Sequence, residues 1–144
     1  VAVIYQSFRL FPLLTVAENV MYPMELRGMK PREARARAAE LTARVGLPDT
    51  ALDRYPTMLS GGEQQRVAIA RALGMDTKIL LADEPTGNLD TANSDNIFRI
   101  LQQLAHEEGY CVIVVTHDMA LAAKADRILE LRDGAVVSGG EGAQ

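Results

Sequence analysis

Two adjacent carboxylates follow a short apolar run near the middle of the chain. Residues 79–82 read ILLA, Asp83 and Glu84 come next, and turn residues follow at 85–88. A short apolar run bounded by turn residues predicts a strand that is buried on both faces of a parallel sheet. Carboxylates at the end of such a strand are costly to desolvate unless they hold a cation or transfer a proton.

These two carboxylates should have different tasks, because successive strand residues point to opposite sides of a sheet. We expect Asp83 to contribute to a Mg²⁺ site and Glu84 to face a water molecule. A solvated strand end before the turn at 85–88 is the simpler alternative.

The run MLSGGEQQR at residues 58–66 predicts the start of a helix. Ser60 and Glu63 have the spacing of a capping box, with Ser60 as the N-cap, and apolar residues recur after them at helical spacing: Val67, Ala70 and Leu73. Gly61 and Gly62 carry no Cβ, so a phosphate could approach the first-turn N–H groups and the positive end of the helix dipole. A capped helix without a ligand is the alternative, because capping boxes are common.

Two further apolar runs also end in polar residues. Residues 2–5 are followed by Gln6, and residues 111–115 are followed by Thr116, His117 and Asp118. Ligands of open α/β sheets bind outside the carboxyl ends of the strands. We therefore expect four side chains to converge on one crevice: Gln6, Asp83, Glu84 and His117.

The remaining pattern predicts helices and turns between these strands. Thr15 and Glu18 predict a capped helix that runs to about residue 27 and ends at Gly28. Pro31 opens a second helix, which ends at Gly46 and has an apolar face made of Ala34, Ala38, Leu41 and Val45.

The sequence pattern in the last third of the chain predicts two more helices and a hairpin. The helices cover residues 91–108 and 119–124. The turn Asp133-Gly134 joins strands at 128–131 and 135–137, and residues 127–131 are expected to belong to the core sheet. Residues 139–144 are expected to form a loose tail.

Composition limits the possible classes of protein. With 144 residues and 48% apolar content, the chain can bury a core and is one domain or most of one. It has no apolar run near the ~20 residues of a membrane span, so direct membrane insertion is not expected. The net charge of −4 argues against nucleic acid as the main ligand, and the single Cys111 suits a reducing compartment.

These motifs together resemble the nucleotide-binding ATPase domain of ABC transporters, over residues 1–138. Gln6 in IYQSFRLFPLLTVAEN resembles the family's Q-loop, LSGGEQQR its signature motif, and ILLADE its Walker B segment. GNLD at 87–90 resembles the D-loop, and His117 the switch histidine. The sequence of the loops is most similar to that of the branch that includes lipoprotein-releasing, macrolide-exporting and cell-division ATPase subunits.

One motif of that family does not occur in the sequence. The family's phosphate loop, GxxxxGK[ST], precedes the Q-loop, whereas the only lysines here are Lys30, Lys78 and Lys124. We therefore interpret the chain as a fragment, the C-terminal part of an α/β P-loop NTPase domain with a mostly parallel core sheet. In this interpretation residues 1–14 and 75–138 belong to the core α/β subdomain and residues 15–74 form an α-helical subdomain.

The resemblance implies hydrolysis of ATP with Mg²⁺. Glu84 is then the base for the attacking water, Asp83 a partner of the Mg²⁺, and Gln6 a contact to the metal or the water. His117 contacts the γ-phosphate. The other residues implied to bind nucleotide belong to the signature motif and the D-loop: Ser60, Gly61, Gly62, Glu63 and Asp90.

The resemblance also implies two partners. A second nucleotide-binding domain pairs head to tail, so that the signature motif acts on the ATP of the other subunit. A transmembrane permease meets residues 8–16 and the first helix, on the cytoplasmic face of the cell membrane. The apolar candidates for this contact are Phe8, Leu10, Phe11, Leu13 and Leu14.

Two other classes of function are compatible with parts of the pattern. Chromosome-maintenance and repair ATPases share a signature and a Walker B pair, but residues 15–57 lack the coiled-coil heptads expected of them. A non-enzymatic fragment that self-associates without binding nucleotide is the other alternative. Without the phosphate loop, we expect negligible hydrolysis by the isolated 144 residues.

Overall fold

The computed structural model describes residues 1–141, which form two compact units that meet in sequence between Val114 and Val115. The first unit contains β1 (Ala2–Tyr5), α1 (Val16–Leu26), α2 (Pro31–Arg44), α3 (Gly61–Leu73), β2 (Ile79–Asp83), α4 (Thr91–His106) and most of β3 (Cys111–Val115). Short 3-10 turns lie between α2 and α3 at Asp49–Ala51 and Pro56–Met58. The second unit contains α5 (Met119–Ala122), β4 (Arg127–Arg132) and β5 (Ala135–Glu141).

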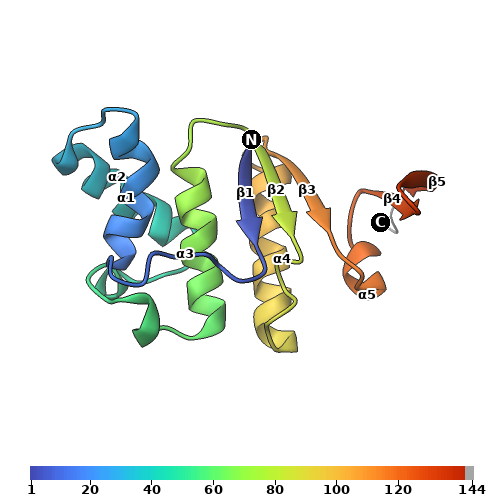
Figure 1. The fold of residues 1–144 in the computed structure, drawn as a ribbon, viewed down its shortest axis with the longest axis horizontal. Coiled ribbons are helices and arrows are strands. Elements are labelled where there is room, and N and C mark those ends of the chain that lie inside the picture. The colour runs from blue at the N-terminus through green and yellow to red at the C-terminus, as the bar shows by residue number, and fades with distance from the viewer. Residues whose placement is uncertain (142–144) are drawn as a thin grey trace. The chain divides into compact units, whose positions relative to one another are not determined.

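The strands of the first unit form a sheet in the order β1-β2-β3 (Figure 1). β1 and β2 are parallel, and their last paired residues are Tyr5 and Asp83. Because paired parallel strands end at the same edge of a sheet, the residues that follow them are neighbours. The predicted strands at 2–5, 79–82 and 111–115 are therefore confirmed, with β2 one residue longer than predicted.

The sheet has one covered face and one bare face. The covered face packs on α3 and α4, and its side chains are buried: Ala2, Ile4, Leu80 and Ala82. On the opposite face Ile79 is 41% exposed and Ile113 is 49% exposed. No element of the first unit covers that face, so the prediction that residues 79–82 are buried on both sides is wrong for this structure.

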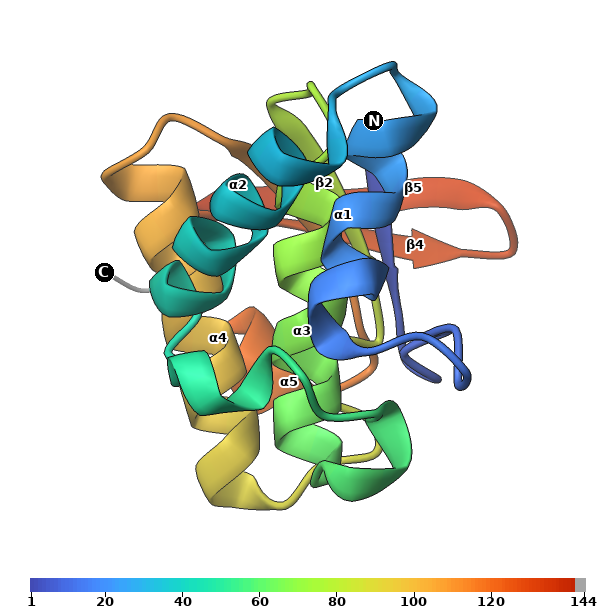
Figure 2. The same cartoon turned by 90° about the vertical axis from the view of Figure 1, so that its left-hand side faces the viewer.

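Helices α1, α2 and α3 pack on one another beside the sheet (Figure 2). The capping box of Thr15 and Glu18 is present at the start of α1, as predicted. The predicted apolar face of α2 is fully buried against its neighbours: Ala34, Ala38, Leu41 and Val45. Gly28 and Gly46 follow α1 and α2 with φ of +88° and +80°, the left-handed conformation that glycine adopts without strain.

The second unit contains the predicted hairpin. Asp133 and Gly134 both have positive φ, as the tight turn of a two-residue hairpin requires. β4 pairs antiparallel with β5 in a two-stranded sheet of their own, so the prediction that residues 127–131 belong to the core sheet is wrong for this structure. β5 continues to Glu141, which pairs with Arg127 of β4. The prediction that residues 139–141 form a loose tail is therefore wrong for this structure. The rest of that predicted tail lies outside the described residues.

Candidate functional site

Gln6 and the turn after β2 form one polar patch at the carboxyl ends of β1 and β2. Gln6 follows Tyr5, and Tyr5 pairs with Asp83. The side-chain amide of Asn88 donates to the carbonyl oxygen of Gln6 at 3.1 Å, and Nε2 of Gln6 donates to Oδ1 of Asn88 at 3.4 Å. The structure therefore places three of the four residues that the sequence predicts to converge at neighbouring strand ends: Gln6, Asp83 and Glu84.

Glu84 leaves the strand with a positive φ of 44°, which is uncommon for a residue with a side chain. β2 ends at Asp83, and the turn closes with a hydrogen bond from the N–H of Gly87 to the carbonyl of Glu84 at 3.1 Å. The simple alternation of strand side chains therefore does not apply to Glu84, and the backbone turn sets its direction. Such strained residues cluster at functional sites.

Gly87 allows Gln6 to lie close to this turn. A Cβ atom on Gly87 would lie 2.9 Å from Cδ of Gln6 and closer still to its amide nitrogen. Any larger residue at position 87 would displace Gln6. The contact keeps the first residue after β1 next to the residues after β2.

The start of α3 has the predicted capping box. Ser60 Oγ accepts from the N–H of Glu63 at 3.2 Å, and Oε1 of Glu63 accepts from the N–H of Ser60 at 3.1 Å. The Ser60 backbone N–H lowers the pKa of Glu63 below its ordinary value, and partial burial acts in the opposite direction. The Glu63 carboxylate is thus occupied by the cap, whereas the Ser60 residue itself is exposed.

Gly62 is buried against α4. A Cβ atom on Gly62 would lie 3.2 Å from Cβ of Asn93 and closer still to its amide group. Asn93 also donates its side-chain amide to Oδ1 of Asp90 at 2.9 Å, and Asp90 caps α4 by accepting from the Asn93 N–H. Helix packing therefore requires glycine at position 62, a reason that the sequence analysis did not consider. Gly61 is half-buried near Leu89 and Phe8.

The loop after β1 has a strained turn that α3 supports. Phe8 and Arg9 have φ of 62° and 49°. The Arg71 guanidinium donates to the carbonyl of Arg9 at 2.7 Å and to that of Phe8 at 3.2 Å. Burial lowers the pKa of Arg71, although an arginine stays charged at any ordinary pH.

His117 lies in the second unit, just after β3. Its neighbours form a local turn: Thr116 Oγ1 accepts from the N–H of Asp118 at 3.1 Å, and Asp118 caps α5. His117 is exposed. Its expected convergence with Glu84 stays a prediction, because the two residues belong to different units.

The carboxylates of the first unit suit a metal ion that a nucleotide accompanies. Residues 1–141 hold no group of three or more histidine, cysteine, aspartate or glutamate side chains arranged to bind a metal ion. Mg²⁺ is commonly held by one or two carboxylates together with phosphate oxygens and water, rather than by a cage of protein ligands. The adjacent Asp83 and Glu84 at an open strand end fit that donor set.

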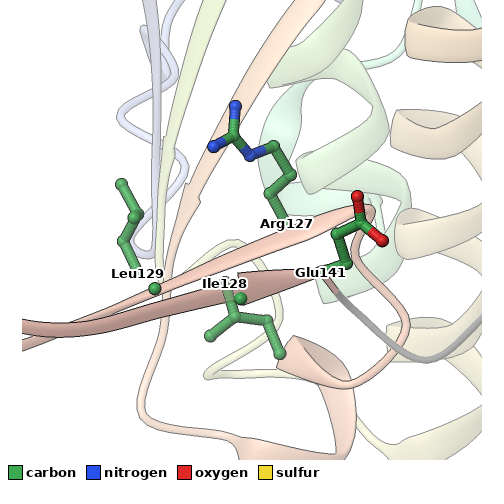
Figure 3. Close-up of a pocket in the computed structure, with 6 residues that line it drawn as sticks. Arg127, Ile128, Leu129 and Glu141 are labelled. Atoms are coloured by element: carbon green, nitrogen blue, oxygen red, sulfur yellow. The ribbon is translucent and has the colours of Figure 1, made fainter.

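Two surface depressions are lined by other residues. One lies on the hairpin, between the start of β4 and the end of β5, where Arg127 and Leu129 project from one face and Ile128 from the other (Figure 3). It contains none of the predicted site residues. The second, an apolar groove of about 330 Å³, lies beside the loop after β1 and includes Phe11, Tyr22, Leu26 and Arg71.

The sequence analysis missed several residues that shape the site. Gln65, Arg71, Asn88 and Asn93 each bond to, or pack on, a predicted site segment. One signal was available for Gln65, which lies at helical spacing between the buried residues Gly62 and Ile69. A polar residue on the apolar face of a helix needs a partner, and that need could have identified it.

The fold is that of an ABC cassette, and comparison with known proteins agrees. Residues 1–87 match the ABC transporter family, and the chain belongs to that family. Its cassette fold is also that of the ATP-binding cassette MJ0796, solved as a dimer in a post-hydrolysis state with ADP and Pi. The TM-score is 0.84 at 41% identity, over 97% of this chain and 62% of that chain.

Curated relatives are similar over most of this chain. The lipoprotein-releasing system ATP-binding protein LolD of Ruegeria sp. (strain TM1040) is 50% identical over 137 residues, 95% of this chain and 60% of that protein. The macrolide export ATP-binding/permease protein MacB of Syntrophobacter fumaroxidans is 47% identical over 92% of this chain and 19% of that protein. The chain thus spans about 60% of the length of this LolD relative. The predicted family, its branch and the fold class are confirmed.

Proposed function

We propose that the chain is the C-terminal part of an ATP-hydrolysing subunit that powers a transmembrane permease. The observation that carries this proposal is the patch formed by Gln6, Asp83 and Glu84 at the ends of two paired parallel strands. The names of the relatives support it, because LolD and MacB are both named as ATP-binding proteins and MacB also as a permease.

The proposed chemistry assigns one task to each residue of the patch. Glu84 accepts the proton of the water that attacks the γ-phosphate, and its backbone departs from the strand with a φ of 44°. Asp83 and Gln6 hold the Mg²⁺, Gln6 through its exposed side-chain amide oxygen. When bound, Mg²⁺ supplies positive charge that stabilises the transferring phosphoryl group.

The capped end of α3 completes the proposed site across a dimer, whereas His117 belongs to the same subunit's site as Glu84. Gly61 and Gly62 present first-turn N–H groups beside the Ser60 cap, at a helix start where a phosphate is stabilised by the helix dipole. Glu63 supports them by holding the cap, and Asp90 sits beside the same helix start through Asn93. His117 contacts the γ-phosphate. The partner is a second copy of the cassette, as in the dimeric MJ0796 structure.

The permease is proposed to meet the groove beside the loop after β1. Leu13 is 86% exposed, and the rings of Phe11 and Tyr22 pack on each other at a tilt, with centroids 4.8 Å apart. Of the predicted contact residues, Phe8 approaches Gly61 and Leu10 packs against the core, so Phe11 and Leu13 are the proposed contacts. Among residues 1–141, no helix combines the length and apolar character needed to cross a bilayer. The chain would reach the cytoplasmic face of the membrane through this surface.

The bare sheet face favours a second candidate for the 144 residues taken alone. Exposed apolar side chains on that face, Ile79 and Ile113 among them, favour self-association without nucleotide. This candidate and ATP hydrolysis make different predictions, because only hydrolysis depends on Glu84.

Substitution of Glu84 tests the proposed function. In the full-length gene product, Glu84→Gln should keep ATP binding and lower kcat by roughly 10²–10⁴-fold, because the proton acceptor is lost. Glu107→Gln makes the same chemical change at an exposed position after α4 and should leave kcat unchanged. Binding is measured with a fluorescent ATP analogue and turnover by phosphate release. Equal loss of binding and turnover, or full turnover by Glu84→Gln, would contradict the role of Glu84.

A further inference from the structure

Gln65 is a fully buried polar side chain in the second turn of α3, with 0% of its surface exposed. Its Nε2 donates to the carbonyl of Pro85 at 2.6 Å and to the carbonyl of Tyr5 at 3.3 Å. Asn19 and Thr42 are also buried and polar, but each bonds to carbonyl groups close to it in the sequence. Gln65 instead joins three separate segments of the first unit.

The two carbonyl groups that Gln65 holds flank the proposed catalytic residues. Tyr5 immediately precedes Gln6, and Pro85 immediately follows Glu84. The paired register of β1 and β2 ends at Tyr5 and Asp83, so no strand pairing holds Pro85. The short bond from Gln65 therefore fixes the backbone on the far side of Glu84, whose φ of 44° departs from the strand.

Stability alone does not explain an amide at this position. Buried polar groups cost free energy unless they are hydrogen-bonded, and Oε1 of Gln65 is buried without a hydrogen-bond partner among the described residues. The flanking residues Val67, Ala68 and Ile69 of α3 bury apolar side chains. An apolar residue of similar length would fill the same space without that cost.

We propose that Gln65 is a positioning residue, which couples the start of α3, where the signature motif lies, to Glu84 and Gln6. This inference rests on the proposed function. Gln65 and Gly62 lie three residues apart on the same face of α3, so a displacement of the helix start carries Gln65 with it. Its two hydrogen bonds then move the ends of β1 and β2. Engagement of nucleotide by Ser60–Gly62 is thereby linked to the position of the proposed base.

Gln65→Met in the full-length gene product separates positioning from packing. Methionine has a similar length but no N–H donor, so it removes both hydrogen bonds and keeps most of the volume. We expect kcat for MgATP to fall about tenfold to a hundredfold, because a small misplacement of a catalytic group has effects of that size. The KM for ATP should stay within about twofold, because uniform binding is not changed.

Two matched variants control for the chemical change and for burial. Gln103→Met makes the same replacement at an exposed position of α4, and Thr42→Val removes a buried polar group from α2. Both should keep the wild-type kcat, even if Thr42→Val lowers Tm. A Gln65→Met variant that is less stable but keeps the wild-type kcat would overturn the proposal, since Gln65 would then serve packing only.

Gln65→Glu supplies a second measurement that a packing role would not affect. The neutral carboxyl can donate one hydrogen bond to the Pro85 carbonyl, whereas the ionised form faces two carbonyl oxygens and donates none. The ratio of variant to wild-type kcat should therefore rise as the pH falls from about 8.5 to 6. A ratio that does not change with pH, or failure of both Gln65 variants to fold, would overturn the proposal.

The same measurements distinguish this inference from the proposed function. A wild-type protein without MgATP hydrolysis, or a fully active Glu84→Gln variant, would reject the ATPase assignment itself. A wild-type enzyme that hydrolyses ATP and matches Gln65→Met in kcat would reject only the positioning role.

Discussion

A Cβ atom on Gly62 would overlap the side-chain amide of Asn93, so α3 and α4 meet at a position that only glycine fills without a shift. The overlap involves the amide group of Asn93, while its Cβ would lie in tight contact at 3.2 Å. Asn93 in turn is tied to Asp90 by a 2.9 Å hydrogen bond. The start of α3 and the N-cap of α4 therefore pack against each other through Gly62 and Asn93.

Gly62→Ala should destabilise the full-length protein through this contact. Overpacking a tight site typically costs about 1–3 kcal/mol, while alanine favours a helix over glycine by about 1 kcal/mol, so we expect a net loss of up to about 2 kcal/mol. Chemical denaturation measures the free energy of unfolding.

Asn93→Ala provides the matched rescue for that variant. The double variant Gly62→Ala with Asn93→Ala should lose less free energy of unfolding than the two single variants lose together, because the overlapping amide group is gone. Strict additivity of the two changes would show that Gly62 and Asn93 are not in contact.

Glu63 should make stability depend on pH through the capping box. The Ser60 N–H lowers its pKa in the folded protein, so its contribution is fully present above the ordinary glutamate pKa of about 4.3. It is lost as the pH falls through the lowered folded pKa. We therefore expect the advantage of wild type over Glu63→Gln in free energy of unfolding to shrink below about pH 4. A difference that stays constant from neutral to acidic pH would contradict the capping role.

The strained loop after β1 should depend on Arg71. Arg71→Met removes two charge-assisted hydrogen bonds to the carbonyls of Phe8 and Arg9, with an expected loss of about 2–3 kcal/mol. Backbone N–H groups of the loop should also exchange faster with deuterium, because the positive φ values lose their support. Arg99→Met, at an exposed position of α4, is the control and should change neither quantity. Unchanged exchange in the Arg71 variant would assign the loop conformation to other contacts.

Features that depend on neighbouring residues could be predicted from the sequence. The capping boxes at Thr15 and Ser60 use residues three apart, and the Asp133-Gly134 turn requires two adjacent residues, so each signal is complete within a few positions. The apolar spacing from Ala34 to Val45 likewise predicted the buried face of α2. The strand ends followed from the same local reasoning.

Features that depend on distant segments could not be predicted in this way. Gln65 bonds to Tyr5 and Pro85, which are 60 and 20 residues away, and no local pattern encodes those partners. The positive φ of Glu84 arises in a turn whose sequence also permits ordinary conformations. β2 is buried on one face, which depends on the helices that cover the sheet. A strand covered on one face and a strand covered on both faces can have the same apolar run, so the sequence does not distinguish them.

The bare face of the sheet should make the isolated 144-residue chain associate with itself. Ile79 and Ile113 are 41% and 49% exposed on a parallel sheet, a type of sheet that is normally covered on both faces. Light scattering coupled to size-exclusion chromatography should detect a mass above that of the 15.7 kDa monomer. Ile113→Lys should weaken the association by at least about tenfold, because a buried unpaired charge costs more than 1.4 kcal/mol. Leu26→Lys, on α1 at a residue that is 70% exposed, should leave it unchanged. A monomeric wild-type chain, or equal effects of both lysines, would show that this face does not drive association.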